Sequence, residues 1–308
     1  MKFTEAYAKL KEEARKGLQK AAVNVPVANP KAAALAMDLS QRAKTNIASC
    51  KDNFRNRRFA DAAEDLQQGV EKASKSFGLL TGTLLPKDSE MRSVGHYSYK
   101  AFLVHFRDFY PRLHALMEAE AEISKNKLFD NLVMRGVGKI LRKAFDAQLQ
   151  SLPTVDKVEA EITELKDLDA AVMWKATLGL DASNKWVASS LADLQKPAII
   201  RGRLKILAGV CVGVISHLNI FDKETIERVN LADALGRAGL KLFSLSLLTC
   251  WHLEPARYPP LDKYWDLAAY NVTSPFVRAI PTFTEHAESA IEHGITASRI
   301  VQKLNAGV

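Results

Sequence analysis

An arginine and a histidine stand four residues apart in the segment RSVGH, at Arg92 and His96. A guanidinium group binds a phosphate through charge-assisted hydrogen bonds, and an imidazole accepts or donates a proton near neutral pH. Together the two side chains could cleave RNA without a metal, with Arg92 holding the phosphate and His96 acting as general acid or base. The alternative is that Arg92 is a solvated loop residue and that His96 packs or caps locally at a helix start.

A second polar group occurs in the segment HLEPARY. A histidine and a glutamate on one turn, with an arginine nearby, can form a binding site or an acid–base site. The alternative is a structural turn in which the arginine pairs with a carboxylate of the bundle, such as Glu71, while the tyrosine packs. The four residues are His252, Glu254, Arg257 and Tyr258.

Two basic groups could track the phosphates of a nucleic acid. One follows a helical stripe at spacings of four, three and one: Arg135, Lys139, Arg142 and Lys143. The other lies between two predicted helices: Arg55, Arg57 and Arg58. Each group has two interpretations: it could bind phosphates, or it could be a charged face that only contacts solvent.

The formal net charge of the 308 residues is +8, which favours an anionic partner such as a nucleotide or RNA. The most apolar runs are too short to span a bilayer, so no membrane partner is expected. The three cysteines lack the spacing of a zinc site, and we expect neither a metal nor a cofactor. Unpaired thiols are typical of a reducing compartment, and we expect the protein in the cytoplasm. The cysteines are Cys50, Cys211 and Cys250.

Helical periodicity runs through most of the chain and alternating strand patterns are missing, so the sequence predicts an all-α protein. One helix is predicted from Pro30 to about Asn53, with Asn29 as its cap, and the next from Phe59 to a break at Gly82. Further helices are predicted at roughly 125–150, 155–178, 184–195, 197–219 and 222–253. A last helix should begin with Ser274 as cap and Pro275 as first residue.

Two apolar stripes define the faces that should be buried. On the helix from Phe59 the stripe is Phe59, Ala62, Ala63, Leu66, Val70, Ala73, Phe77 and Leu80. On the last helix it is Phe276, Ile280, Phe283, Ala287, Ile291 and Ile295. An ion pair between Glu71 and Lys75 should support the first of these helices, and a kink is expected at Pro281 in the second.

The helix FADAAEDLQQGVEKASKSFGLLTG, followed by SVGHYSYKAFL, resembles the second core helix of HEPN domains and the segment after it. The turn ARYPP at 256–260 is similar to the ARYP-like turn before the last helix of that family. The resemblance covers roughly 35–120 and 245–304. It implies a HEPN-like helical bundle with a large helical insertion, divided as follows: an N-terminal helix and loop at 1–30, the bundle at 31–120 and 245–304, and inserted helices at 121–244.

HEPN proteins include RNase toxins and modules that bind nucleotides or partners. The RNase members carry an R-x4-6-H motif late in the bundle, whereas Arg92 and His96 are one residue closer together and lie earlier in the chain. The sequence therefore predicts a non-catalytic module that binds a nucleotide, a nucleic acid or a protein. Two alternatives remain: a metal-independent RNase using Arg92 and His96, with Arg257 on the phosphate, and a structural scaffold. Long apolar helix faces also suit a homodimer.

Overall fold

The computed structural model of the protein describes residues 27–87, 97–103, 154–166, 223–252 and 269–307, with Pro111, Lys143 and Gln150 as single residues. These residues form helices, turns and short connections, and no strand occurs among them. The all-α prediction is confirmed for this part of the chain. The predicted helices at 184–195 and 197–219, and almost all of the one at 125–150, lie outside the described residues.

The chain divides into two compact units. The first comprises Met1–Val25, Phe106–Glu164 and Pro197–Val229, and the second comprises Pro26–His105, Leu165–Lys196 and Asn230–Val308. Most of helix α8 (Val155–Lys166) belongs to the first unit. The candidate site described below belongs to the second unit. The predicted division at 120 and 245 stays a prediction.

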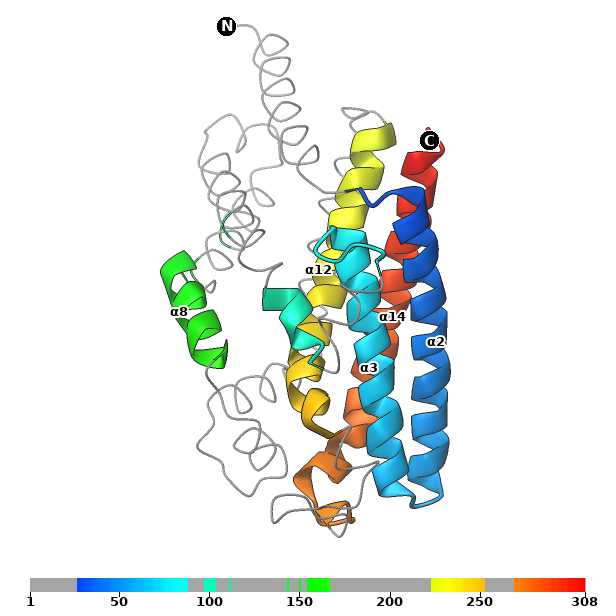
Figure 1. Ribbon diagram of the computed structural model, residues 1–308, viewed down its shortest axis with the longest axis vertical. Helices are drawn as coiled ribbons and strands as arrows, with labels where there is room; N and C mark the ends of the chain where they lie inside the picture. The colour runs from blue at the N-terminus through cyan, green and yellow to red at the C-terminus, as the bar shows by residue number, and fades with distance from the viewer. Residues whose placement is uncertain are drawn as a thin grey trace, which may run out of the picture. The chain divides into compact units, whose positions relative to one another are not determined.

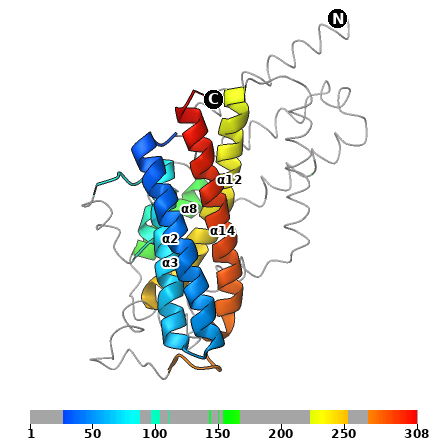
Figure 2. The ribbon, with the colours of Figure 1, turned by 90° about the vertical axis from the view of Figure 1, so that its right-hand side faces the viewer.

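The second unit is built around a bundle of four long helices (Figure 1, Figure 2). They are α2 (Pro30–Arg55), α3 (Phe59–Thr81), α12 (Lys223–Thr249, from Asn230 onward in this unit) and α14 (Pro275–Asn305). Successive helices run in opposite directions, as in an up-down-up-down bundle. A short 3-10 turn, η1 (Cys250–His252), follows α12 and contacts α3.

Helix α2 begins where the sequence predicts. The Asn29 side chain accepts a hydrogen bond from the backbone N–H of Ala32 at 2.9 Å, and Pro30 occupies the first helical turn. Such a cap satisfies one of the backbone donors that a helix start leaves without a partner. The helix ends at Arg55, two residues beyond the predicted end.

Helix α3 is enclosed on more sides than its apolar stripe predicts. Of the predicted stripe, only Phe59 is partly exposed, and the other members are buried. Residues outside the stripe, among them Gln67, Ser74 and Ser76, are also buried. The reason is that α3 packs against α2, α14 and η1, so neighbouring helices cover it around much of its circumference. At its end Gly82 adopts the left-handed conformation with φ 73°.

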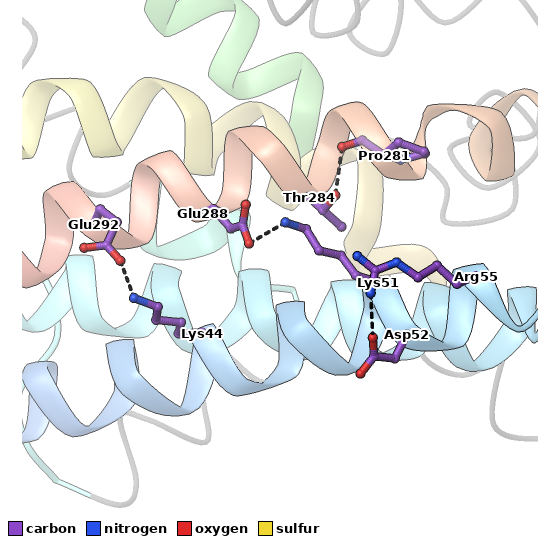
Figure 3. A network of polar contacts seen from close by, with 8 residues as sticks. All are labelled: Lys44, Lys51, Asp52, Arg55, Pro281, Thr284, Glu288 and Glu292. Atoms are coloured by element: carbon purple, nitrogen blue, oxygen red, sulfur yellow. Dashed lines mark hydrogen bonds and ion pairs between the residues drawn. The ribbon is translucent and has the colours of Figure 1, made fainter.

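Helix α14 also begins as predicted, with Ser274 in an extended conformation before Pro275. The Ser274 side chain makes no capping hydrogen bond, unlike Asn29 at the start of α2. Every residue of the predicted stripe is buried. Pro281 stands inside the helix, and the Thr284 hydroxyl donates a hydrogen bond to its carbonyl oxygen at 2.8 Å (Figure 3).

Polar contacts join the antiparallel pair α2 and α14 along its length. Lys44 Nζ lies 2.6 Å from Glu292 Oε1, and Lys51 Nζ lies 2.5 Å from Glu288 Oε1 (Figure 3). At one end, Asn305 Nδ2 donates to the carbonyl oxygen of Ala28 at 3.0 Å. This last contact places the end of α14 beside the start of α2.

Two more of the predicted helices are described by the structure, at least in part. Helix α8 begins at the predicted residue and is described as far as Lys166. The predicted helix 222–253 corresponds to α12 and η1. Among the described residues, no helix combines the length and the apolar character that a bilayer span requires.

Candidate functional site

The connection between α2 and α3 is a tightly hydrogen-bonded turn rich in arginine. The backbone N–H of Arg57 donates to the carbonyl of Phe54 at 3.0 Å, and that of Arg58 donates to the carbonyl of Asn53 at 2.9 Å. These two bonds have the pattern of a Schellman motif, which satisfies the last carbonyl groups of a helix. We call the four residues Arg55, Asn56, Arg57 and Arg58 the arginine turn.

Arg57 holds the left-handed position of this motif, with φ 58°. Glycine is the usual residue there, because a side chain in this conformation costs about 1–2 kcal/mol. Two other described residues with positive φ, Gly82 and Gly307, follow the ends of α3 and α14 and are glycines. Arg57 is the one non-glycine residue with positive φ in the described part of the chain. The α2–α3 connection therefore keeps an arginine where the chain elsewhere uses glycine.

The charges of the arginine turn are mostly uncompensated. Arg55 pairs with Asp52 at 3.0 Å, and both side chains are largely exposed, so solvent weakens this ion pair. Arg57 and Arg58 are exposed, and neither has an ion pair or a side-chain hydrogen bond with another residue in the described ranges. One carboxylate, Asp61, lies in the first turn of α3. Two guanidinium groups thus remain available to a ligand from solvent.

Two phenylalanines flank the arginine turn. The rings of Phe54 and Phe59 meet edge to face, with centroids 5.6 Å apart and planes at 61°. Both residues are partly exposed. The arginine turn thus has a partly exposed phenylalanine on each side in the sequence. The turn lies at the same end of the bundle as the start of α14 (Figure 1, Figure 2).

His252, from the predicted polar group, lies in the core of the bundle. Its Nδ1 atom is 2.8 Å from the hydroxyl of Tyr270, and its ring stacks on Phe276 with centroids 3.6 Å apart. The side chain is 0% exposed, and burial lowers its pKa from 6.5 to about 3. The imidazole is therefore neutral near pH 7 and has no direct contact with solvent.

Glu71 makes the ion pair that the sequence predicts. Its carboxylate lies 2.6 Å from Lys75 Nζ, with 14–15% of each side chain exposed, and it also accepts a hydrogen bond from Gln67 at 3.1 Å. Helix α3, which carries Glu71, contacts the η1 turn that carries His252.

The other predicted site residues lie outside the described residues. They are Arg92, His96, Glu254, Arg257 and Tyr258, together with Arg135, Lys139 and Arg142 of the basic stripe. The roles expected of these residues stay predictions. Within the described ranges, no group of three or more His, Cys, Asp and Glu side chains could hold a metal ion.

Comparison of the chain with protein-family models, with curated proteins and with solved structures finds no match in any of the three. The HEPN-like interpretation therefore rests on the residues of this chain alone.

The sequence singles out the three arginines of the turn but not their aromatic neighbours. Its apolar pattern places Phe59 in the buried stripe and indicates no role for Phe54. A signal is present, because the short segment FRNRR separates the two predicted helices and contains no glycine. A connection this short between antiparallel helices commonly needs a left-handed residue, which here has to be a residue with a side chain.

Proposed function

We propose that the protein is a non-catalytic, HEPN-like helical module that binds a nucleic acid, and that the arginine turn contributes to its binding surface. The observation that carries the proposal is the pair Arg57 and Arg58, which are exposed, unpartnered among the described residues and fixed on a hydrogen-bonded turn. The formal net charge of +8 agrees with an anionic partner.

The fixed turn favours binding because little backbone freedom is lost when a ligand arrives. The backbone of Arg57 and Arg58 is already ordered by hydrogen bonds to the last turn of α2. Only the side chains must then be immobilised on a phosphate. Arginine presents its donors in a planar fork that suits two phosphate oxygens at once. The turn thus offers two such forks next to each other in sequence.

The HEPN-like part of the proposal draws on the sequence resemblance. The helix FADAAEDLQQGVEKASKSFGLLTG corresponds to α3, which packs against α2 and α14. A central second helix of this kind supports the comparison. The non-catalytic part draws on the short spacing between Arg92 and His96, which departs from the motif of the RNase members.

The experiment measures nucleic-acid affinity as a function of salt concentration for the full chain. Each phosphate contact contributes about 0.7–0.9 to the slope of log K against log salt. The double variant Arg57→Gln/Arg58→Gln should therefore bind more weakly and lose about 1.4–1.8 from the slope. The matched control is Arg42→Gln/Arg299→Gln, which removes two exposed arginines from the middle of α2 and from α14. The control should keep nearly all of the affinity and slope.

An equal loss in both double variants would show that only the net charge matters, and would contradict a role for the arginine turn. An absence of salt-sensitive binding to RNA and to DNA in the unmodified protein would overturn the proposed function.

A further inference from the structure

We infer that the arginine turn binds unpaired nucleotides, with bases stacked on the Phe54 and Phe59 rings and phosphates held by Arg57 and Arg58. This inference rests on the proposed function and names the class of nucleic acid: single strands rather than duplexes. It depends on a juxtaposition within six consecutive residues, FRNRRF, in which a phenylalanine stands at each end and three arginines lie between.

The aromatic part of the site comes from the ring pair at the base of the turn. Phe54 is in the last turn of α2 and Phe59 is the first residue of α3, so one ring comes from each helix. Their edge-to-face contact fixes both ring orientations. Phe54 and Phe59 are each partly exposed, although Ala62, Ala63 and Leu66 further along α3 are fully buried. Exposed aromatic surface of this kind can stack on a base.

The cationic part of the site is continuous with the rings. The backbone N–H of Arg57 donates a hydrogen bond to the carbonyl oxygen of Phe54, and Arg58 directly precedes Phe59. A base on one of the rings therefore has its own backbone phosphates within the reach of a neighbouring arginine side chain. Arginine planes also stack on bases, so the same side chains serve both purposes.

Single strands fit this arrangement better than duplexes because of where the bases are. In a duplex the base faces are stacked on one another, so a protein ring cannot reach them without disrupting the stack. A duplex could therefore use only the arginines, through its backbone. An unpaired strand can use the arginines and the rings together. The ratio of the affinity for a single strand to the affinity for a duplex then measures how much the two rings contribute to binding.

The position of Arg57 agrees with this inference. A glycine would relieve the strained backbone of the turn, yet the chain places a guanidinium group between the two rings in sequence. Strain of this kind persists where the residue has another use.

The test compares binding of a short unstructured oligonucleotide with binding of a duplex of the same length, for RNA and for DNA, at one fixed salt concentration. The unmodified protein should prefer the single strand. Phe59→Leu keeps an apolar side chain but removes the ring, and should weaken single-strand binding roughly tenfold while leaving duplex binding and the salt slope nearly unchanged. Phe59→Tyr keeps a ring and should bind like the unmodified protein.

A second experiment removes bases from the nucleic acid instead of removing the ring from the protein. A strand carrying abasic sites should bind the unmodified protein at least as weakly as Phe59→Leu binds the intact strand, because the variant still has the Phe54 ring. Circular dichroism and thermal unfolding of each variant show whether the fold is retained. If Phe59→Leu does not fold, the abasic strand against the unmodified protein decides the question.

Equal affinity for single strand and duplex, or equal affinity for intact and abasic strands, would overturn the inference. If the arginine variants still lose salt-dependent affinity in that case, the proposed function survives without it. If no nucleic acid binds at all, both fail together.

Discussion

The Nζ atom of Lys51 on α2 lies 2.5 Å from the Oε1 atom of Glu288 on α14, and the two side chains keep 33% and 44% of their surface in solvent (Figure 3). The pair joins helices that are far apart in the sequence but adjacent in the bundle. A second pair on the same two helices, Lys44 and Glu292, is more exposed, at 57% and 56%.

The first prediction concerns the strength of these two pairs. A double-mutant cycle with Lys51→Gln and Glu288→Gln, measured by urea unfolding, should give a coupling free energy of about 0.5–1 kcal/mol. The cycle at Lys44 and Glu292 should give less, because greater exposure brings stronger screening by water and salt. A larger coupling in the more exposed pair would contradict this ranking, as would a coupling at Lys51 that does not weaken in 1 M salt.

The second prediction concerns His252 and pH. In the folded protein its pKa is about 3, whereas in the unfolded chain it is near the ordinary value of 6.5. Between these values the unfolded state binds a proton that the folded state does not, so the free energy of unfolding falls as the pH falls. Protonation of His252 alone lowers the free energy of unfolding by up to about 1.4 kcal/mol for each pH unit in this range.

The variant His252→Phe should lose this contribution. Urea unfolding between pH 7 and pH 4 should show the unmodified protein losing stability more steeply than the variant. Tyr270→Phe is the control, because it removes the hydrogen-bonding hydroxyl but leaves the buried imidazole. Parallel curves for the unmodified protein and His252→Phe would mean that the imidazole is not buried as described.

The third prediction concerns the strained backbone of the arginine turn. Arg57→Gly should raise the free energy of unfolding by about 0.5–1 kcal/mol, because glycine adopts a φ of 58° without steric cost but loses more entropy on folding. The same variant should weaken nucleic-acid binding. The measurements are urea unfolding and affinity on one preparation. Arg58→Gly is the matched control, since its φ of −89° offers glycine no such advantage.

A gain in stability with unchanged affinity would separate Arg57 from the binding surface. If Arg57→Gly is no more stable to urea than Arg58→Gly, the left-handed conformation of Arg57 carries no strain.

The fourth prediction follows from the non-catalytic proposal. RNA incubated with the purified protein in EDTA should remain intact, as judged by denaturing gel electrophoresis. His96→Ala serves as the control for a contaminating nuclease, because it should behave like the unmodified protein. Cleavage by the unmodified protein that disappears in His96→Ala would replace the binding module with a metal-independent RNase.

The sequence predicts those features that depend on neighbouring residues. Asn29 and Pro30 mark a helix start because the cap bond closes within three residues. The ion pair of Glu71 and Lys75 follows from the helical repeat alone. Both are local, so neither requires knowledge of the partner helices.

Features that depend on distant residues could not be predicted in this way. His252 is enclosed by Tyr270 and Phe276, which follow it by eighteen residues or more, and its neutral state depends on them. The burial of Gln67 and Ser74 on α3 likewise reflects the helices around it, since a period of 3.6 marks only the apolar face.

The packing of α14 against α2 and α3 has a consequence for how the chain is made. Helices α2 and α3 leave the ribosome early, but α14, which packs against both, begins only at Pro275. At ordinary rates of synthesis the interval between the end of α3 and the start of α14 lasts about 10–40 s. During that interval α14 cannot yet cover the faces of α2 and α3 against which it later packs.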